Sequence, residues 1–495
     1  MITLYFTWTS PNIILGDNST FGTSTTWLTT FAIIITTALI VSIIVFSKVK
    51  SLFYFIFVKN RYITAPLLLV IVIILQILFV YYVHPVSGFD AGMLHYAAVN
   101  PKHVLESNVI AYYSLNQNNL PITLLMHWIT VQTGHSSWIF FDYITLVLVD
   151  ISAVLNILSI AIVQRKSIGT AIYMHCAWLL FFLSIIMPYT DAWVLPFVSS
   201  YILCYCVIRK ANIHFIFKII VAILFSFALI FTYFIKPSAI IPVIAIMIIE
   251  LLSLTIQKNN FSIPRLTQII LLPVIIGGTS LMTYKITSNT IKEQQYIKIQ
   301  TWRSIPAIHF MSIGVYGNGG YSKKQAIEMA TLPTKSQKTD YSKKMLFKRL
   351  SQLGIFGYLE FIVKKQGNNT ADGTFGWLKE GHFFRENQKP TTKTISGKLK
   401  NFVYLYGRNI ADFRFMAQAW WIFVLSIIAL GYENWKFRDF LKLSLVGGFI
   451  FLLLFEGGRS RYIIQYLPVI LLLATISFAP AIERIKKITT WAKKK

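Results

Sequence analysis

The sequence predicts an all-α polytopic membrane protein with about eleven transmembrane helices. Of its 495 residues, 55% are hydrophobic and only 13% are charged, whereas an average soluble domain has roughly 25% charged residues. The apolar residues occur in runs of about twenty, the length that crosses a hydrocarbon core of about 30 Å. The 3 cysteines all lie in apolar segments, so the sequence indicates neither a disulfide framework nor a zinc site.

The expected spans cover, in order, residues 27–46, 63–83, 138–162, 167–187, 190–208, 213–235, 237–256, 267–284, 416–433, 441–456 and 462–480. Basic residues occur at every second short connection between them, and the positive-inside rule places those connections in the cytoplasm. We therefore expect a multi-pass protein of the cell membrane with its N-terminus outside and its C-terminus in the cytoplasm. No cleavable signal peptide is expected, because the first apolar run begins near Trp27 and is too long for one.

This topology divides the chain into four regions. They are an extra span with its cytoplasmic loop (1–62), a membrane core that includes the first outer loop at 84–137 (63–284), an extracytoplasmic insertion of α or α+β structure (285–415), and C-terminal spans with a basic cytoplasmic tail (416–495). Within the first outer loop, residues 119–134 are apolar but short. We expect a helix that lies in the membrane interface or re-enters it, and whether it crosses the membrane stays open.

The charge of the chain is strongly basic, with 46 Lys and Arg against 19 Asp and Glu and a formal net charge of +27. Such a balance is typical of proteins that bind nucleic acid or an anionic surface. Here part of it sets the membrane orientation and the rest faces outward, so no nucleic acid partner is expected. No Walker-type phosphate loop is evident, which disfavours an ATP-driven pump.

Ionisable residues gather at the expected outer ends of the spans. Asp90 follows the second span, Asp191 the fourth and Lys236 the sixth, while Glu456, Arg459 and Arg461 end the tenth. Each costs roughly 2.5–3.5 kcal/mol at a membrane centre, so such residues are functional candidates by default. Taken one at a time, these residues have simpler interpretations. Asp191 could be a helix cap, and Lys236 could be a side chain that snorkels to the membrane interface.

Together these residues suit transfer of a group from a lipid phosphate at the outer leaflet. Asp90 is the candidate base that takes the proton of an attacking hydroxyl. Lys236, Arg459 and Arg461 are candidates for holding the departing phosphate. Asp191 is a second catalytic candidate that positions the acceptor, assists the base, or binds a divalent cation such as Mg²⁺ or Mn²⁺; no cofactor is certain.

Several strings also resemble a known family. The acidic residues in the first and second outer loops resemble the GT-C glycosyltransferases of the protein mannosyltransferase and aminoarabinose transferase type. More closely, the chain looks like an integral-membrane family of low-GC Gram-positive bacteria assigned to that superfamily, through NQNNLPITLL (116–125), MPYTDAW (187–193), IKPSAIIP (235–242), IPAIHFMSIGVYGNGGY (305–321), ADGTFGWLKEGHFF (371–384) and FEGGRSRYIIQYLP (455–468).

The resemblance implies a GT-C architecture, a polyprenyl-phosphate sugar as donor and a cell-envelope glycan, such as a teichoic acid or wall polysaccharide, as acceptor. It also implies a partner enzyme that makes the lipid-linked sugar. Asp90 takes the first-loop acidic position and Asp191 the second-loop one. The chain departs from the family where GT-C relatives often carry an acidic pair, since each position here holds a single acid, which puts a metal site in doubt. The span at 27–46 precedes the usual first helix and reads as an addition to the core.

Further residues are expected to line the acceptor site or to support it. They are His95, Asn118, Asn119, Tyr189, His309, Asp372, Trp377, Glu380 and Glu456, with Trp377 and Phe375 stacking on sugar faces. The competing readings are that DGTFG at 372–376 is a glycine-containing turn and that His309 is a packed histidine.

The sequence thus favours an envelope glycosyltransferase, an enzyme that works in the lipid bilayer. The rival is a flippase or transporter for lipid-linked saccharides, a class often built from repeats with polar residues near the membrane midplane. A glycan polymerase or ligase shares the same logic at the membrane face and stays open as a third alternative.

Overall fold

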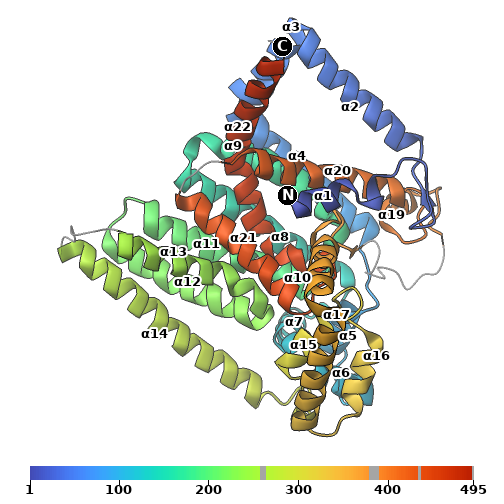
Figure 1. The fold of residues 1–495 in the computed structure, drawn as a ribbon, viewed down its shortest axis with the longest axis vertical. Helices are drawn as coiled ribbons and strands as arrows, with labels where there is room; N and C mark the ends of the chain where they lie inside the picture. The colour runs from blue at the N-terminus through green and yellow to red at the C-terminus, as the bar shows by residue number, and fades with distance from the viewer. Residues whose placement is uncertain (257–262, 378–388, 433–435, 493–495) are drawn as a thin grey trace.

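The computed structural model describes residues 1–256, 263–377, 389–432 and 436–492 (Figure 1). Within these ranges the protein is helical apart from one two-stranded antiparallel sheet, in which β1 (Asp17–Asn18) pairs with β2 (Thr23–Ser24). The large insertion contains no strand in its described residues, so of the two expected forms it takes the α form.

The predicted fold class is confirmed, because 10 of the described helices are long and apolar enough to cross a membrane. The long helices that carry these spans are α2 (Trp27–Val45), α4 (Arg61–Val83), α8 (Trp138–Val163), α9 (Ile168–Phe182), α11 (Leu195–Lys210), α12 (Phe215–Ile235), α13 (Ile241–Ile256), α14 (Ile263–Glu293), α20 (Ile410–Leu430) and α22 (Leu467–Ala492). The remaining expected span, at 441–456, corresponds to α21 (Lys436–Leu454), whose first turns carry Arg438, Asp439 and Lys442. This chain is an integral multi-pass membrane protein.

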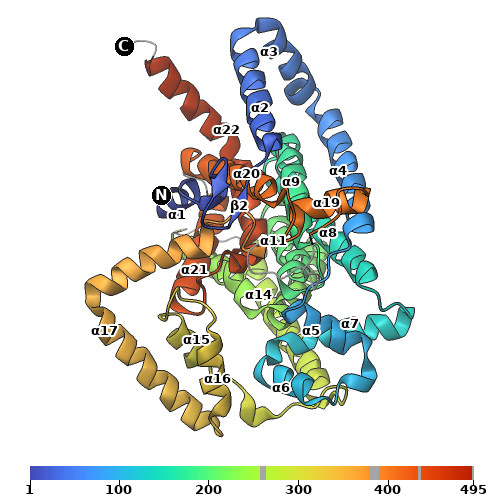
Figure 2. The ribbon, with the colours of Figure 1, turned by 90° about the vertical axis from the view of Figure 1, so that its right-hand side faces the viewer.

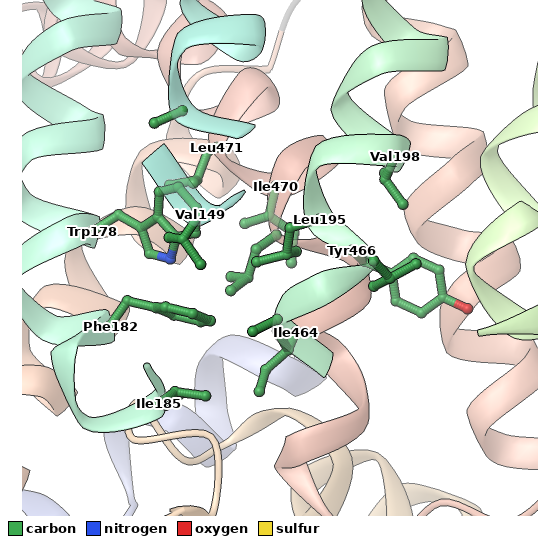
Figure 3. Close-up of a cluster of buried hydrophobic side chains, with 14 of the residues drawn as sticks. Val149, Trp178, Phe182, Ile185, Leu195, Val198, Ile464, Tyr466, Ile470 and Leu471 are labelled. Carbon is green, nitrogen blue, oxygen red and sulfur yellow. The ribbon is translucent and has the colours of Figure 1, made fainter. Parts of the chain in front are cut away.

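The core of the bundle lies between α8, α9, α11 and α22 (Figure 3). Trp178 and Phe182 of α9 face Leu195 of α11 and Ile470 of α22, and all four are fully buried. Large side chains that are fully shielded from the exterior stabilise the bundle through close van der Waals contacts with neighbouring helices.

The first span differs sharply from the last. Only 6% of the most apolar window of α2 is buried inside the protein, against 83% for the span that contains α22. Figure 1 shows α2 standing apart from the bundle, joined to α4 through α3 (Ser47–Tyr54) at its far end. The first span therefore lies at the periphery of the bundle.

The first loop and the insertion gather at one end of the bundle, which we call the cavity side (Figures 1 and 2). The loop forms α5 (Asp90–Val99), α6 (Ser107–Leu115) and α7 (Leu120–Thr133), and the insertion forms α15 (Ala307–Ile313), α16 (Lys323–Thr331), α17 (Lys335–Thr370) and α19 (Ile395–Val403). Helix α7 has 14 residues, and at 1.5 Å per residue it is roughly 21 Å long, shorter than a hydrocarbon core of about 30 Å.

The expected borders of the insertion shift at both ends. Helix α14 runs on to Glu293, and α20 begins at Ile410, so residues expected in the insertion from 285 and up to 415 are parts of these helices. The N-terminal segment, for which the sequence suggested no structure, forms α1 (Ile2–Trp8) and packs against α17 and α20.

Candidate functional site

A cavity of about 1310 Å³ opens between the first loop, the insertion and the ends of the spans. Nine of the residues singled out in the sequence line it: Asp90, Asn118, Asn119, Tyr189, Lys236, His309, Glu456, Arg459 and Arg461. These residues come from six separate stretches of the chain, so the fold brings together groups that lie up to 371 positions apart by number.

Asp90 is the first residue of α5 and lies at the cavity wall. A compact turn precedes it, in which His84 ends α4 with a φ of 32° and a Cβ on Gly92 would come within 2.5 Å of the Ser87 carbonyl oxygen. Tyr112 donates a hydrogen bond to Asp90 Oδ1 and Tyr189 donates one to Oδ2, both at 3.0 Å. The carboxylate is therefore fixed in direction while its side chain stays 36% exposed.

The Tyr112 hydroxyl is itself held in place. Asn119 Nδ2 donates to it at 2.7 Å, and Asn118 Nδ2 donates to Asn119 Oδ1 at 3.2 Å. Burial and the neighbouring Asp90 carboxylate raise the pKa of Tyr112 well above its ordinary value, so the phenol keeps its proton and acts as a donor. The two asparagines thus support the candidate base through Tyr112.

Asp191 lies beneath the cavity rather than at its surface. It stands in the first turn of the short helix α10 (Thr190–Trp193) and caps no helix end; its side chain is 1% exposed. Lys236 forms an ion pair with one of its oxygens, and Arg461 Nε lies 3.4 Å from the other. Two cations therefore meet one buried carboxylate, and the cap reading of Asp191 is wrong.

Lys236 and Arg461 join this buried carboxylate to the cavity. Lys236 ends α12, because Pro237 follows it and cannot continue the helix, and its ammonium turns inward to Asp191 instead of snorkelling outward. Arg461 lies in the 3₁₀ helix η9 (Ser460–Tyr466), and its Nη2 is 3.9 Å from Asp90 Oδ2. The Arg461 guanidinium therefore links both acidic residues.

The loop before η9 is fixed by the insertion. Gly458 has a φ of 68°, its N–H donates to Asn369 Oδ1 of α17, and the Gly457 N–H donates to the Gly319 carbonyl. Lys365 of α17 donates to the carbonyls of Gly314, Leu453 and Phe455, so it clamps the end of α21 to the insertion. Arg459 follows this clamp, lines the cavity and lies over the Tyr321 ring at 5.6 Å.

Glu456 and His309 are the other titratable groups of the cavity wall. Burial raises the pKa of Glu456, although Tyr462 donates a hydrogen bond of 2.7 Å to its carboxylate. Burial lowers the pKa of His309 to about 4, and the nearby Arg349 adds to the effect. His309 is 4% exposed and is thus a packed histidine at the edge of the cavity.

Three of the described residues proposed from the sequence, His95, Asp372 and Trp377, do not line the cavity. His95 is buried and stacks on Trp138 at 4.1 Å. Asp372 accepts hydrogen bonds from the backbone N–H groups of Thr374 and Gly376. It therefore stabilises the turn at 372–376, which was the alternative to a role in the acceptor site. Glu380 lies outside the described residues.

The expected stacking of aromatic rings on a sugar is wrong for the two residues named. Phe375 and Trp377 are each 2% exposed. Trp377 packs edge-on against Phe89 at 5.2 Å, and Phe375 packs against Trp421. These rings support the wall from behind because the turn at 372–376 folds them into the protein.

The donor set does not fit a divalent cation. Asp191 has its oxygens paired with Lys236 and Arg461, and Asp90 faces Arg461, whereas Mg²⁺ or Mn²⁺ requires carboxylates free to coordinate it. Among the residues that the structure describes, no group of three His, Cys, Asp or Glu could hold a metal ion. Asp191 is better explained as the partner of two cations.

The sequence reasoning missed a row of polar side chains inside α8. Asp142, Thr145, Ser152, Asn156 and Ser159 are fully buried. Three of them bond to neighbouring helices: Trp193 donates to Thr145, Ser152 pairs with Ser199, and Asn156 pairs with His175. We call these five residues the α8 seam. Their spacing of three, four or seven residues places them on one helix face, a pattern that could have been read from the sequence.

Comparison with curated proteins and with solved structures finds no match. A family model described as "Conserved hypothetical integral membrane protein" matches residues 1–482, nearly the whole chain. The cavity, the α8 seam and all the long helices except the end of α22 lie within the matched range, and the chain belongs to this family of integral membrane proteins.

Proposed function

We propose that this protein is a membrane glycosyltransferase of GT-C type that moves a sugar from a polyprenyl-phosphate donor to a cell-envelope glycan, such as a teichoic acid or wall polysaccharide. The cavity side then faces outward, as the positive-inside rule expects. The observation that carries the proposal is the cavity itself, where a fixed carboxylate, Asp90, lies 3.9 Å from Arg461, with Lys236 and Arg459 also in the wall.

In this reaction the acceptor hydroxyl oxygen bonds to the anomeric carbon of the sugar, and the bond from that carbon to the phosphate oxygen breaks. Asp90 takes the proton of the attacking hydroxyl. Each of its oxygens accepts one tyrosine hydrogen bond and retains a lone pair for the proton. The departing phosphate gains negative charge, which fixed cations stabilise in a site that needs no rearrangement.

The cations of the cavity support a phosphate ligand. Lys236, Arg459 and Arg461 all line it. Lys236 and Arg461 are held in place by the buried Asp191. The three cations lie close to the expected membrane surface, where the phosphate of a lipid-linked sugar would arrive.

The test is transfer of radiolabelled sugar from a polyprenyl-phosphate donor to envelope acceptor by purified protein in vesicles. Replacing Asp90 by Asn should lower the transfer rate about 10²–10⁴-fold, the usual contribution of a general base, while donor binding persists. Envelope glycan analysis of a deletion strain should show loss of one sugar substituent. Full turnover by the folded Asp90→Asn protein would exclude Asp90 as the base.

A second candidate is a flippase for lipid-linked saccharides, and the α8 seam is the observation that favours it. Transporters place polar groups near the membrane midplane, and Asn156 and His175 pair inside the bundle. The same vesicles separate the two functions: a flippase moves labelled lipid-linked sugar across the bilayer without acceptor, and an Asn156→Leu variant would then lose translocation whereas Asp90→Asn would retain it.

A further inference from the structure

The longest helix of the insertion carries an exposed apolar stripe. Helix α17 bends at Gly354, whose φ of 61° and ψ of −176° are not helical. After the bend, Ile355 and Phe356 are 79% and 87% exposed, and Leu359 and Val363 are exposed too. At about 100° per residue these four side chains share one face of the helix. Together they form an exposed apolar surface, which is unfavourable in contact with water.

Hydrogen bonds place the end of this helix beside a membrane span. Gln418 of α20 donates to the carbonyls of Thr7 in α1 and Ala371 just after α17, and Trp421 of α20 donates to the Thr370 carbonyl. At 1.5 Å per residue, Gln418 and Trp421 lie roughly 12 and 16 Å along α20 from its first residue. The end of α17 and the end of α1 therefore lie next to the first turns of a span rather than beyond it.

The direction of α17 changes at the bend (Figure 2). The part after the bend runs across the direction of α2 and α4, whereas the part before it points away from the bundle toward α16. A helix that crosses the direction of the spans near their ends lies along the plane of the membrane. Its exposed stripe is then at the depth of the lipid headgroups.

Helix α1 adds a second apolar element at this level. It packs on α17, where Phe6 lies against Gly367. Its residues Ile2, Tyr5 and Trp8 are exposed. Tyrosine and tryptophan are enriched where a membrane meets water, because their rings are apolar and their polar tips are wet.

Lysines precede the bend and complete the pattern. Lys343, Lys344 and Lys348 of α17 are exposed on the side of the bend away from the span. Basic residues near a membrane surface are attracted to anionic headgroups by about 1 kcal/mol each. Apolar residues at headgroup depth, with lysines roughly 9 to 17 Å along the helix on the water side of the bend, fit a bilayer that contains anionic lipid.

We propose that α1 and the part of α17 after Gly354 form a membrane-association surface that embeds in the lipid leaflet on the cavity side. The insertion is then attached to the bilayer through the second part of α17, and the part of α17 before Gly354 projects into water. The inference stands on depth, exposure and charge, and it is independent of the reaction at the cavity.

The experiment places a fluorophore on the stripe of the full-length protein. Phe356→Cys is labelled with a thiol-reactive nitrobenzoxadiazole dye and reconstituted in vesicles of phosphatidylethanolamine and phosphatidylglycerol, with or without doxyl-labelled phosphatidylcholine. The three native cysteines are buried, and labelled wild type serves as the blank. The expected result is a blue-shifted emission that doxyl lipid quenches severalfold more strongly than it quenches a dye on Ile327→Cys.

Ile327 is the matched control because it is an exposed apolar residue on α16, which lies farther from the spans. Leu359→Cys is read in the same way should Phe356→Cys fail to fold. Equal access of aqueous iodide to the dyes at 356 and 327, without quenching by doxyl lipid, would overturn the proposal. Emission at 356 that is blue-shifted but insensitive to doxyl lipid would also overturn it, since protein rather than lipid would then cover the stripe.

Discussion

Two buried aspartates of this protein differ in the partners that surround their carboxyl groups. Asp191, beneath the cavity, and Asp142, in the α8 seam, are both 0% exposed. Asp191 pairs with Lys236 and lies 3.4 Å from Arg461. Asp142 has no hydrogen-bond partner for either carboxylate oxygen among the residues that the structure describes.

The difference separates a charged site from a neutral one. A lone ion in an apolar interior costs many kcal/mol, so an isolated carboxyl there is most stable without charge. A carboxylate between two cations can remain ionised, because the desolvation penalty is offset by close opposite charges. Burial alone therefore does not mark a reactive residue, whereas burial with paired charge next to a cavity does.

The largest expected effect comes from removing the paired carboxylate. Asp191→Asn leaves Lys236 and Arg461 buried with one partner fewer, which should lower the free energy of unfolding by about 3–5 kcal/mol. Asp142→Asn, with the same change of atoms at an equally buried position, should alter it by less than about 1 kcal/mol. Denaturant unfolding in detergent micelles, followed by tryptophan fluorescence, measures both. Equal losses in the two variants would remove the distinction between them.

A smaller effect is expected from the tyrosines that orient Asp90. Tyr112→Phe removes the donor to Asp90 Oδ1 and the acceptor of Asn119. A hydrogen bond to a charged group contributes about 1.5–3 kcal/mol to stability. We expect Tyr112→Phe to lower the free energy of unfolding by an amount at the lower end of this range, because Asp90 is 36% exposed. When Tyr112→Phe is made in an Asp90→Asn background, the loss of unfolding free energy should shrink by about half or more. A loss of the same size in both backgrounds would mean that Tyr112 acts through packing alone.

The smallest expected effect concerns Glu456, a partly buried carboxyl in the cavity wall. Because burial raises its pKa above the ordinary 4.5, the folded state binds more protons than the unfolded state between those two values. Stability should then fall as pH rises through that window. Glu456→Gln should lack this component and gain roughly 1 kcal/mol or less at neutral pH, measured as unfolding temperature between pH 4 and 8. A variant with the same pH profile as wild type would show that Glu456 is not the titrating group.

Much of the fold could be predicted from the sequence because it depends on local composition. Runs of about twenty apolar residues locate the spans whatever their neighbours are, and Pro237 alone ends α12 at Lys236. The positions of Asp90, Lys236, Arg459 and Arg461 at the ends of spans follow from the same runs, and the structure places all four at one cavity.

Other features depended on packing between distant segments. Trp377 looked available for a sugar but is buried against Phe89. Tyr112 was not singled out, although it orients Asp90, because nothing in its own stretch of sequence indicates that Asp90 lies beside it. Asp142 was missed for a different reason, since the polar spacing of α8 was present in the sequence and was read only as part of an apolar run.

The sequence by itself determined an integral membrane protein, the extent of its spans and the side on which its ionisable residues gather, because hydrophobic length and charge act residue by residue. Only the tertiary structure decided which of those residues meet. It placed Asp191 between Lys236 and Arg461 and turned Trp377 inward. Each of these outcomes depends on contacts between segments far apart in the chain, and no local pattern encodes such a contact.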